Sequence, residues 1–266
     1  MTNPAPLIQM SRLHVVCPSC QDTLDIAGET ILCPSCRTTY PLQDGIYDFA
    51  PGVGPQPGFG QRVLESRIGA RLYEDYLRMN FVRVMGQNWD GGLTPEAEDA
   101  YLVRQVTPVE VPILDLACGA GRWTHTLVET FGAERVIGLD LSSSMLKRTR
   151  RLLSEVLLLR ADAARLPFAD ASLGAVNCSN SLQLFPDPEA VIAEVGRCLK
   201  PGGTFTFFTF RKSPSPAYRL LQRACEELNR VKAFQEDDLR AWLSQAGLRV
   251  TDLGGPNLII LGTAER

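Results

Sequence analysis

The chain has 266 residues, of which 45% are hydrophobic and 21% are charged, close to the averages of globular proteins. This length is sufficient for one large domain and a small one, each with its own buried residues. The sequence has no apolar run long enough to span a bilayer and no basic segment followed by an apolar stretch at its N-terminus. We therefore expect a soluble, cytoplasmic protein. The formal net charge of −3 argues against a broad basic surface for nucleic acid.

The N-terminal part is marked by its cysteines. Four of the eight cysteines form two Cys-Pro-Ser-Cys motifs, Cys17–Cys20 and Cys33–Cys36. Each motif directs two thiolates at one centre, and together they complete the tetrahedral shell of a structural zinc site. The alternatives are a redox dithiol pair and an iron centre, but the thioredoxin-like context of a redox motif is missing. Alternating residues on both sides of Ala27 and Gly28 predict a short hairpin between the motifs.

The metal would stabilise a segment too small to fold by burial alone. After the second motif come Tyr40-Pro41 and Asp44-Gly45-Ile46. With these features, residues 12–50 resemble the small zinc-ribbon proteins that activate RNA and translation-factor methyltransferases. The resemblance implies that the ribbon, assigned to residues 1–50, docks on a catalytic domain. We expect it to pack on the rest of the chain, because the edge of its hairpin needs a partner.

Residues 51–95 are interpreted as a linker and an N-terminal helical cap. Residues 50–60 hold four glycines and three prolines, which excludes a helix or an inner strand. Residues 61–85 carry apolar side chains at helical spacing and are predicted to be helical. Their arginines, including Arg78, are interpreted as a solvated helix face rather than a phosphate-binding stripe.

Residues 96–266 alternate short β-rich runs with helical patterns, which predicts crossover units and a parallel sheet covered on both faces. The expected strands are 111–116, 135–139, 155–159, 173–177 and 204–210, and the expected helices are 121–131, 142–153, 188–199, 216–230 and 236–246. Segments 248–253 and 257–264 predict an antiparallel hairpin. The expected fold is therefore α/β, with a Rossmann-like, seven-stranded, mostly parallel sheet that ends in an antiparallel hairpin, plus the small zinc ribbon.

Three carboxylates follow three successive predicted strands. Asp115 precedes a turn with Gly119 and Gly121, Asp140 ends the second strand, and Asp162 follows the third. A dinucleotide fingerprint would require a further glycine, but Thr124 is found at that place. A carboxylate after the second strand can accept hydrogen bonds from a ribose. Each aspartate alone could be a helix cap, but three at the ends of three successive strands favour a nucleoside site.

These features resemble the class I S-adenosylmethionine-dependent methyltransferases, in particular the ubiquinone and menaquinone C-methyltransferase subgroup. The matching segments are residues 115–121, 138–146, 162–168 and 194–203. For the methionine part of the cofactor, the resemblance implies contacts from Asp115, Ala117, Gly119, Gly121 and Ser179. For the ribose it implies Asp140, and for the adenine it implies Leu141, Met145, Asp162 and Ala163.

The sequence departs from that subgroup near the expected acceptor site. Leu182-Gln183 stands where the subgroup often has Leu-His, so an amide replaces a potential base. We take Gln183 as a candidate substrate contact and assign no catalytic base. The basic run at residues 147–151 is interpreted as the solvated face of an outer helix.

The predicted function is methyl transfer from S-adenosylmethionine to a small-molecule acceptor of biosynthetic type, beside a structural zinc site. One alternative is an rRNA or tRNA base methyltransferase, because some of these enzymes also join an N-terminal zinc finger to this catalytic domain. A second alternative is a cofactor-binding scaffold without activity. The three intact aspartates argue against the scaffold, and the acidic balance of the chain argues against RNA.

Overall fold

A computed structural model describes residues 13–27, 30–53, 78–107 and 112–266. The prediction of a helix over 61–85 therefore falls partly outside the described residues, and only its end is seen, as α4 (Arg78–Gly86). In the part of the chain that the structure describes, no helix has the length and apolar character needed to span a membrane.

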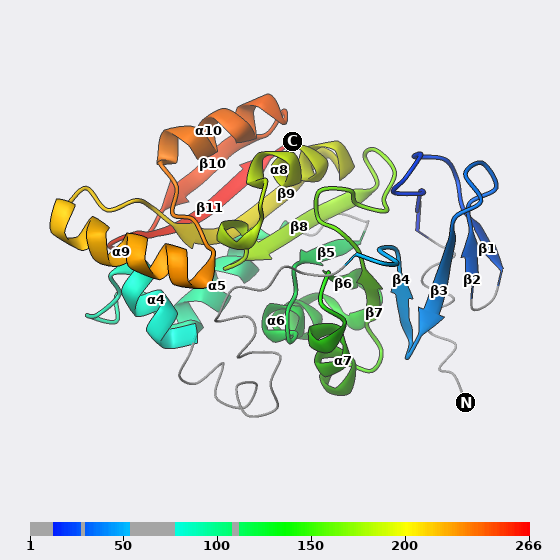
Figure 1. The fold of residues 1–266 in the computed structure, drawn as a ribbon, viewed down its shortest axis with the longest axis horizontal. Coiled ribbons are helices and arrows are strands. Elements are labelled where there is room, and N and C mark those ends of the chain that lie inside the picture. Colours follow the sequence, from blue (N-terminus) through cyan, green and yellow to red (C-terminus); the bar gives the residue numbers. More distant parts are fainter. Residues whose placement is uncertain (1–12, 28–29, 54–77, 108–111) are drawn as a thin grey trace.

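The centre of the molecule is a sheet with five neighbouring parallel strands, in the order β7-β6-β5-β8-β9 (Figure 1). Their bounds are β5 Ile113–Leu116, β6 Val136–Asp140, β7 Leu157–Arg160, β8 Leu173–Ser179 and β9 Leu199–Phe210. Every residue of β5 and β8 is buried, as expected for strands covered on both faces. The predicted parallel sheet is confirmed, and β9 begins earlier than expected.

The C-terminal hairpin is also confirmed. β10 (Arg249–Gly254) pairs antiparallel with β11 (Ile259–Glu265), and β11 pairs antiparallel with β9. Thus the last strand in the sequence lies inside the sheet and β10 forms its edge.

Helices cover both faces of this sheet (Figure 1). Their bounds are α6 Arg122–Phe131, α7 Ser143–Leu152, α8 Pro188–Cys198, α9 Pro216–Asn229 and α10 Glu236–Gln245. Short 3₁₀ turns occupy Ala133–Arg135 and Leu182–Leu184. Each of the five helices lies within two residues of its predicted range. The hydroxyl of Ser142 and the carboxylate of Asp187 accept backbone N–H bonds at the starts of α7 and α8, so standard N-caps set these boundaries.

One helix, α5 (Pro95–Gln105), was not predicted. The Thr94 hydroxyl caps it and Pro95 occupies its first turn, a start signal that the sequence does contain. Before it, α4 packs on α9, where the Tyr218 hydroxyl donates to the carbonyl of Val84 over 2.8 Å.

The seven strands predicted for residues 96–266 are present as β5 to β11, but the sheet does not end with them: it continues to eleven strands. The additional four come from the cysteine-bearing module: β1 Asp25–Ala27, β2 Thr30–Leu32, β3 Thr39–Gln43 and β4 Ile46–Asp48. These strands pair antiparallel with one another, and β4 pairs parallel with β7. Without β4, the edge of β7 would carry unpaired backbone groups. The expectation that the module packs on the rest of the chain is confirmed.

The module also shares the hydrophobic core. Tyr40, Tyr47 and Phe49 are buried in one cluster with Leu139 and Leu159 of the parallel strands. The backbone pairing and this shared core make the module a lateral extension of the central sheet.

Candidate functional site

Asp115 is buried at the carboxyl end of β5, where it connects three elements. The Thr124 hydroxyl of α6 donates to Oδ2 of Asp115 over 2.5 Å, and the Asn177 amide of β8 donates to Oδ1 over 2.7 Å. Burial raises the pKa of Asp115 to about 6, although both hydrogen bonds act in the opposite direction. Asn177 was not predicted as a site residue from the sequence, and Thr124 was noted only because it replaces a glycine of the dinucleotide fingerprint.

Asp140 organises the neighbouring strand end. The backbone N–H of Gly119 donates to Oδ2 over 2.9 Å, and that of Ser142 donates to Oδ1 over 2.7 Å. Burial raises the pKa of Asp140 despite these donors. Since a carboxylate has about four lone-pair sites, these two bonds leave acceptor capacity for the hydroxyls of a ligand.

The turn between β5 and α6 contains three residues with positive φ: Ala117 and Gly119 at +56° and Gly121 at +90°. A Cβ on Gly121 would lie 2.9 Å from Cγ2 of Thr149, so this position is crowded. A Cβ on Gly119 would meet no atom of the described residues within 4 Å, so with respect to these residues its backbone faces open space. The Thr149 hydroxyl donates to the Gly119 carbonyl over 2.8 Å and fixes the turn to α7. The turn thus presents exposed backbone to a ligand at this point.

Ala117 is the residue of this turn that combines a side chain with a positive φ, a conformation that side chains disfavour. A left-handed conformation costs a non-glycine residue about 1–2 kcal/mol. A glycine at the same position lowers the free energy of unfolding by about 0.4–1 kcal/mol, because it gives the unfolded chain more conformational freedom. We expect Ala117→Gly to leave the free energy of unfolding unchanged or raise it by about 0.5 kcal/mol, measured by urea denaturation. Ala120→Gly, at a position without positive φ, should lower it by up to about 1 kcal/mol. Equal losses in both variants would contradict the strain at Ala117.

The other predicted cofactor residues lie at the same edge of the sheet. Leu141 directly follows Asp140, and Met145 is buried in the first turn of α7. Asp162 follows β7, its Oδ1 accepts the backbone N–H of Ala164 over 3.0 Å, and Ala163 is buried. Because the backbone N–H of Ala161 donates to the carbonyl of Asp140 over 3.3 Å, the ends of β6 and β7 lie side by side.

After β8, a polar network continues from Asn177. The Ser179 hydroxyl donates to Oδ1 of Asn177 over 2.8 Å, so Ser179 is coupled to Asp115 through one residue. Gln183 is buried; its Nε2 donates to Oδ1 of Asn180 over 2.7 Å, and its Oε1 accepts from the Thr209 hydroxyl over 3.0 Å. Gln183 therefore joins the loop after β8 to β9, and its contact with a substrate stays a prediction.

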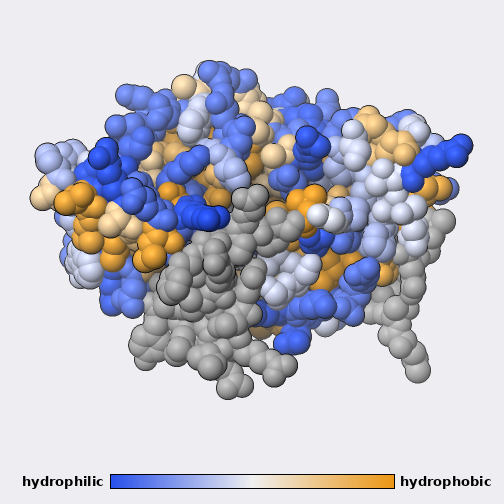
Figure 2. All heavy atoms as spheres, in the orientation of Figure 1, coloured by the Kyte–Doolittle hydropathy of each residue, from blue (hydrophilic) through white to orange (hydrophobic). Residues whose placement is uncertain are grey.

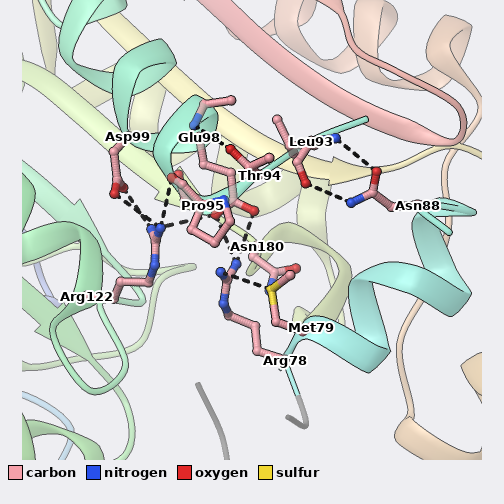
Figure 3. Close-up of polar contacts among 12 residues, drawn as sticks. Arg78, Met79, Asn88, Leu93, Thr94, Pro95, Glu98, Asp99, Arg122 and Asn180 are labelled. Atoms are coloured by element: carbon pink, nitrogen blue, oxygen red, sulfur yellow. Dashed lines mark hydrogen bonds and ion pairs between the residues drawn. The ribbon is translucent and has the colours of Figure 1, made fainter. Parts of the chain in front are cut away.

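An ion-pair cluster adjoins this network (Figure 3). Nη1 of Arg78 lies 2.9 Å from Oε2 of Glu98, and both side chains are buried. Arg122, at the start of α6, pairs with Asp99 over 2.9 Å and lies over the ring of Trp123. Burial raises the pKa of Glu98, although Arg78 and Arg122 act in the opposite direction. The interpretation of Arg78 as part of a solvated face is wrong, because its guanidinium closes this cluster.

The cluster and the polar network border one small cavity. The residues around it come from α5, α6, β8, β9 and β11: Glu98, Tyr101, Leu102, Trp123, Asn177, Ser179, Thr206, Phe207, Phe208 and Leu261. Its polar wall therefore combines Glu98 with Asn177, which donates to Asp115, and with Ser179, which donates to Asn177.

The four cysteines of the N-terminal module converge as predicted. Their sulfur atoms all lie within 4.8 Å of one another, with 3.5 Å between Cys17 and Cys36 and between Cys20 and Cys33. Four thiolates around a tetrahedral zinc ion, with Zn–S bonds of about 2.3 Å, would be separated by about 3.8 Å. The donor set therefore fits a zinc ion in both number and spacing.

The two motifs have the same local geometry. Gln21 and Arg37, directly after the second cysteine of each motif, have φ of +61° and +59°. The hydroxyl of Tyr40 lies 3.1 Å from the sulfur of Cys17. Hydrogen bonds with Thr38 lower the pKa of Cys36 to about 6.

The basic run on α7 contributes to the contact with this module. Nζ of Lys147 lies 2.9 Å from Oδ2 of Asp44, and Arg150 donates to the carbonyl of Gly45 over 2.6 Å. Burial lowers the pKa of Arg150. The interpretation of the run as a solvated face is wrong for Arg150, which is partly buried against the turn between β3 and β4, whereas Lys147 stays exposed as predicted while it pairs with Asp44.

The strand ends that carry Asp115 and Asp140 belong to a region that is similar to a known protein family. Residues 113–203, which contain the glycine turn and Asp140, match the family model of a methyltransferase domain. This part of the chain therefore resembles a methyltransferase domain. The fold of the chain is shared with geranyl diphosphate C-methyltransferase from Streptomyces coelicolor, solved with S-adenosyl-L-homocysteine (TM-score 0.55, 16% identity, 64% of this chain and 80% of that chain). The fold also resembles that of a chain in the complex of the Haloferax volcanii Trm112 methyltransferase activator with a methyltransferase (TM-score 0.54, 21% identity, 71% and 95% of the two chains).

Curated proteins also match the methyltransferase domain. An uncharacterised chloroplastic methyltransferase of Arabidopsis thaliana is 35% identical over 149 residues, 52% of this chain and 40% of that protein. Demethylmenaquinone methyltransferase of Lactococcus lactis is 37% identical over 40% of this chain and 45% of that protein. Malonyl-[acyl-carrier protein] O-methyltransferase of Methylococcus capsulatus is 31% identical over 52% and 54%. The chain spans about half the length of these relatives, or less.

Proposed function

We propose that the protein binds S-adenosylmethionine at the carboxyl ends of β5, β6 and β7 and transfers its methyl group to a small-molecule acceptor. The observation that carries this proposal is the pairing of Asp140 with the Gly119 turn. One carboxylate holds the open backbone of the turn and keeps lone pairs for ligand hydroxyls. A nucleoside with a charged tail fits this combination.

The residues around Asp140 and the Gly119 turn contact different parts of the nucleoside. Asp140 accepts the ribose hydroxyls, while Leu141, Met145 and Ala163 supply apolar surface for the adenine. Asp162 accepts from the exocyclic amino group at the edge of the base. All of these residues lie on adjacent strand ends or in the turns directly after them.

The methionine end of the cofactor then lies towards Asp115 and Ser179. With a pKa of about 6, Asp115 is mostly ionised near neutral pH and attracts the ammonium group. The cofactor supplies an electrophilic methyl group on a positively charged sulfur. The protein must hold the acceptor in line with this methyl group, at about 3 Å, and exclude water. This reaction requires little acid–base help, which agrees with the amide of Gln183 where a base would otherwise stand.

A small-molecule acceptor is favoured over RNA by the surface charges. Lys147 and Arg150 belong to the strongest basic run of the sequence, and both contact the N-terminal module. With these charges engaged and a net charge of −3, attraction for a phosphate backbone is weak. The relatives named for demethylmenaquinone and malonyl-[acyl-carrier protein] support the same choice.

We also propose that Cys17, Cys20, Cys33 and Cys36 bind a structural zinc ion. Four sulfur ligands complete the coordination shell and leave no open position for a reactant. The role of the ion is therefore to fold the module rather than to take part in methyl transfer.

The test of the proposed function is a transfer experiment. The purified zinc-loaded protein is incubated with methyl-labelled S-adenosylmethionine and, separately, with the metabolite and RNA fractions of a cell extract. We expect label in the metabolite fraction and, at a cofactor concentration far below the dissociation constant, about 10- to 100-fold less label with Asp140→Asn. Label in the RNA fraction alone would favour the nucleic-acid alternative, and a wild-type protein that does not bind S-adenosyl-L-homocysteine would refute the proposal.

A further inference from the structure

Arg160, the last residue of β7, connects the N-terminal module with the expected cofactor site. Its Nη1 donates to both carboxylate oxygens of Asp48 over 2.8 Å and to the carbonyl of Ala50 over 2.8 Å. Its Nη2 donates to the carbonyl of Val53. Its Nε points the other way and donates to the carbonyl of Leu141 over 3.0 Å. One mostly buried guanidinium thus binds the end of the module and the residue directly after Asp140.

The register of the sheet explains why this side chain reaches both sides. Arg160 is paired with Asp48 of β4 on one side and with Asp140 of β6 on the other. Because the three strands are parallel, these residues lie at the same level of one sheet edge. Asp48 also accepts the backbone N–H of Ala50 over 2.9 Å, and its carboxylate is the module's counter-charge to Arg160.

The module also holds the segment that carries Asp162 and Ala163. Before this segment, the backbone N–H of Phe49 donates to the carbonyl of Arg160 over 2.7 Å. After it, the N–H of Ala169 donates to the carbonyl of His14 over 2.8 Å, and that of Val16 donates to the carbonyl of Pro167 over 3.2 Å. Residues 161–166, which provide the expected adenine edge, therefore lie between two attachments to the module.

The second attachment lies directly beside the cysteine site. Val15 forms a β-bridge with Phe168, and the next residues are Val16 and the metal-ligand candidate Cys17. The backbone N–H of Cys17 donates to the carbonyl of Asp22 over 2.8 Å, which fixes the backbone at this cysteine. Only one or two peptide units separate Cys17 from Val16 and Val15, which contact this segment, so an ordered cysteine site also restrains residues 167–169.

We propose that Arg160 is a positioning residue of the cofactor site, and that through Arg160 and residues 167–169 the metal-bound module raises the affinity for S-adenosylmethionine. This inference rests on the proposed function. The module fixes Leu141 from one side and Asp162 and Ala163 from the other, so a disordered module leaves the adenine and ribose contacts less well preorganised. Because coupling between two sites is reciprocal, the bound cofactor must also retain the metal more tightly.

The first test measures the dissociation constant of S-adenosyl-L-homocysteine by calorimetry on the zinc-loaded protein. Asp48→Asn removes the charge that orients Arg160 without touching the cofactor residues, and Arg160→Lys keeps a charge for Asp48 but loses the bond to Leu141. We expect each to weaken binding about tenfold, within the usual range of coupling between sites. Since both variants break the same connection, the double variant should be less than twice as weak as the weaker single variant.

The matched control is Lys147→Ala, which removes another ion pair between the module and the domain. This pair is exposed and does not contact residues 140–141 or 161–169, so its loss should change the dissociation constant less than twofold. Zinc content and melting temperature are measured for every variant, and affinities are compared only among variants that retain one zinc ion per chain.

The second test uses reciprocity, which a purely structural contact would not produce. The distribution of zinc between the protein and a competing colorimetric chelator is measured at equilibrium, with and without saturating S-adenosyl-L-homocysteine. We expect the ligand to raise the zinc affinity of the wild type about tenfold and to have little effect in Asp48→Asn and Arg160→Lys. If the wild type binds the nucleoside but its affinities for nucleoside and zinc match those of both variants, Arg160 has no positioning role and the proposed function is unaffected. If the wild type does not bind the nucleoside, both proposals are refuted.

Discussion

Asp140→Asn is expected to raise the dissociation constant of S-adenosyl-L-homocysteine by about 10- to 100-fold. Hydrogen bonds to a charged group contribute about 1.5–3 kcal/mol each, and 1.4 kcal/mol corresponds to about a factor of ten in affinity. The substituted amide can still accept one of the two backbone bonds from Gly119 and Ser142, but its NH₂ group then faces the other donor. The variant therefore loses a ribose acceptor and loosens the glycine turn. Calorimetry with the purified protein measures the effect.

Asp187→Asn provides the control for a carboxylate that only caps a helix. Asp187 accepts the backbone N–H of Ala190 over 3.1 Å at the start of α8, and asparagine caps helices equally well. Its dissociation constant should equal that of the wild type. Should Asp140→Asn also leave the affinity unchanged while the wild type binds, Asp140 acts as a backbone cap and its ribose assignment must be given up.

The parallel part of the fold and the cysteine cluster could be predicted because each depends on a local pattern. Buried strands such as β5 and β8 are mostly apolar, and the glycine turn and the aspartates near the strand ends follow from chain order alone. The four cysteines define a common centre by spacing, whatever the rest of the fold does. Where helix boundaries were predicted correctly, capping residues such as Ser142 and Asp187 set them.

The errors concern features that depend on contacts distant in the sequence. Nothing local to Ile46–Asp48 indicates that this strand joins β7, so the continuation of the seven-stranded sheet into the module was not predicted. Arg78 was interpreted as solvated because its partner, Glu98, is 20 residues away on a helix that was not predicted. Likewise, Lys147, Arg150 and Arg160 resemble ordinary surface charges in the sequence. Their partners lie in the turn between β3 and β4 and at the end of β4, about 100 residues away.

Metal removal is expected to have the largest effect on stability. Without the ion, the cysteines no longer bond to a common centre, and the short strands β1 to β4 would lose the site that holds them together. Unfolding of the module exposes the edge of β7 and uncovers Tyr40, Tyr47 and Phe49, which share a core with the parallel strands. A loss of about 3 kcal/mol would lower the melting temperature of a domain of this size by about 6–12 °C. Cys17→Ser should have the same effect as chelation.

Two comparisons separate this effect from a general loss of cysteine or from chelator binding. Cys225→Ser changes a partly buried thiol on α9, outside the module, and should melt within about 2 °C of the wild type, as most changes away from a tightly packed core do. Adding zinc back to the chelated protein should restore the melting temperature, but it should not rescue Cys17→Ser. Because the unpaired edge of β7 can pair with other chains, the metal-free protein should also aggregate on heating. A melting temperature that stays constant after metal analysis has verified complete removal would show that β4 and the shared core hold the module without an ion.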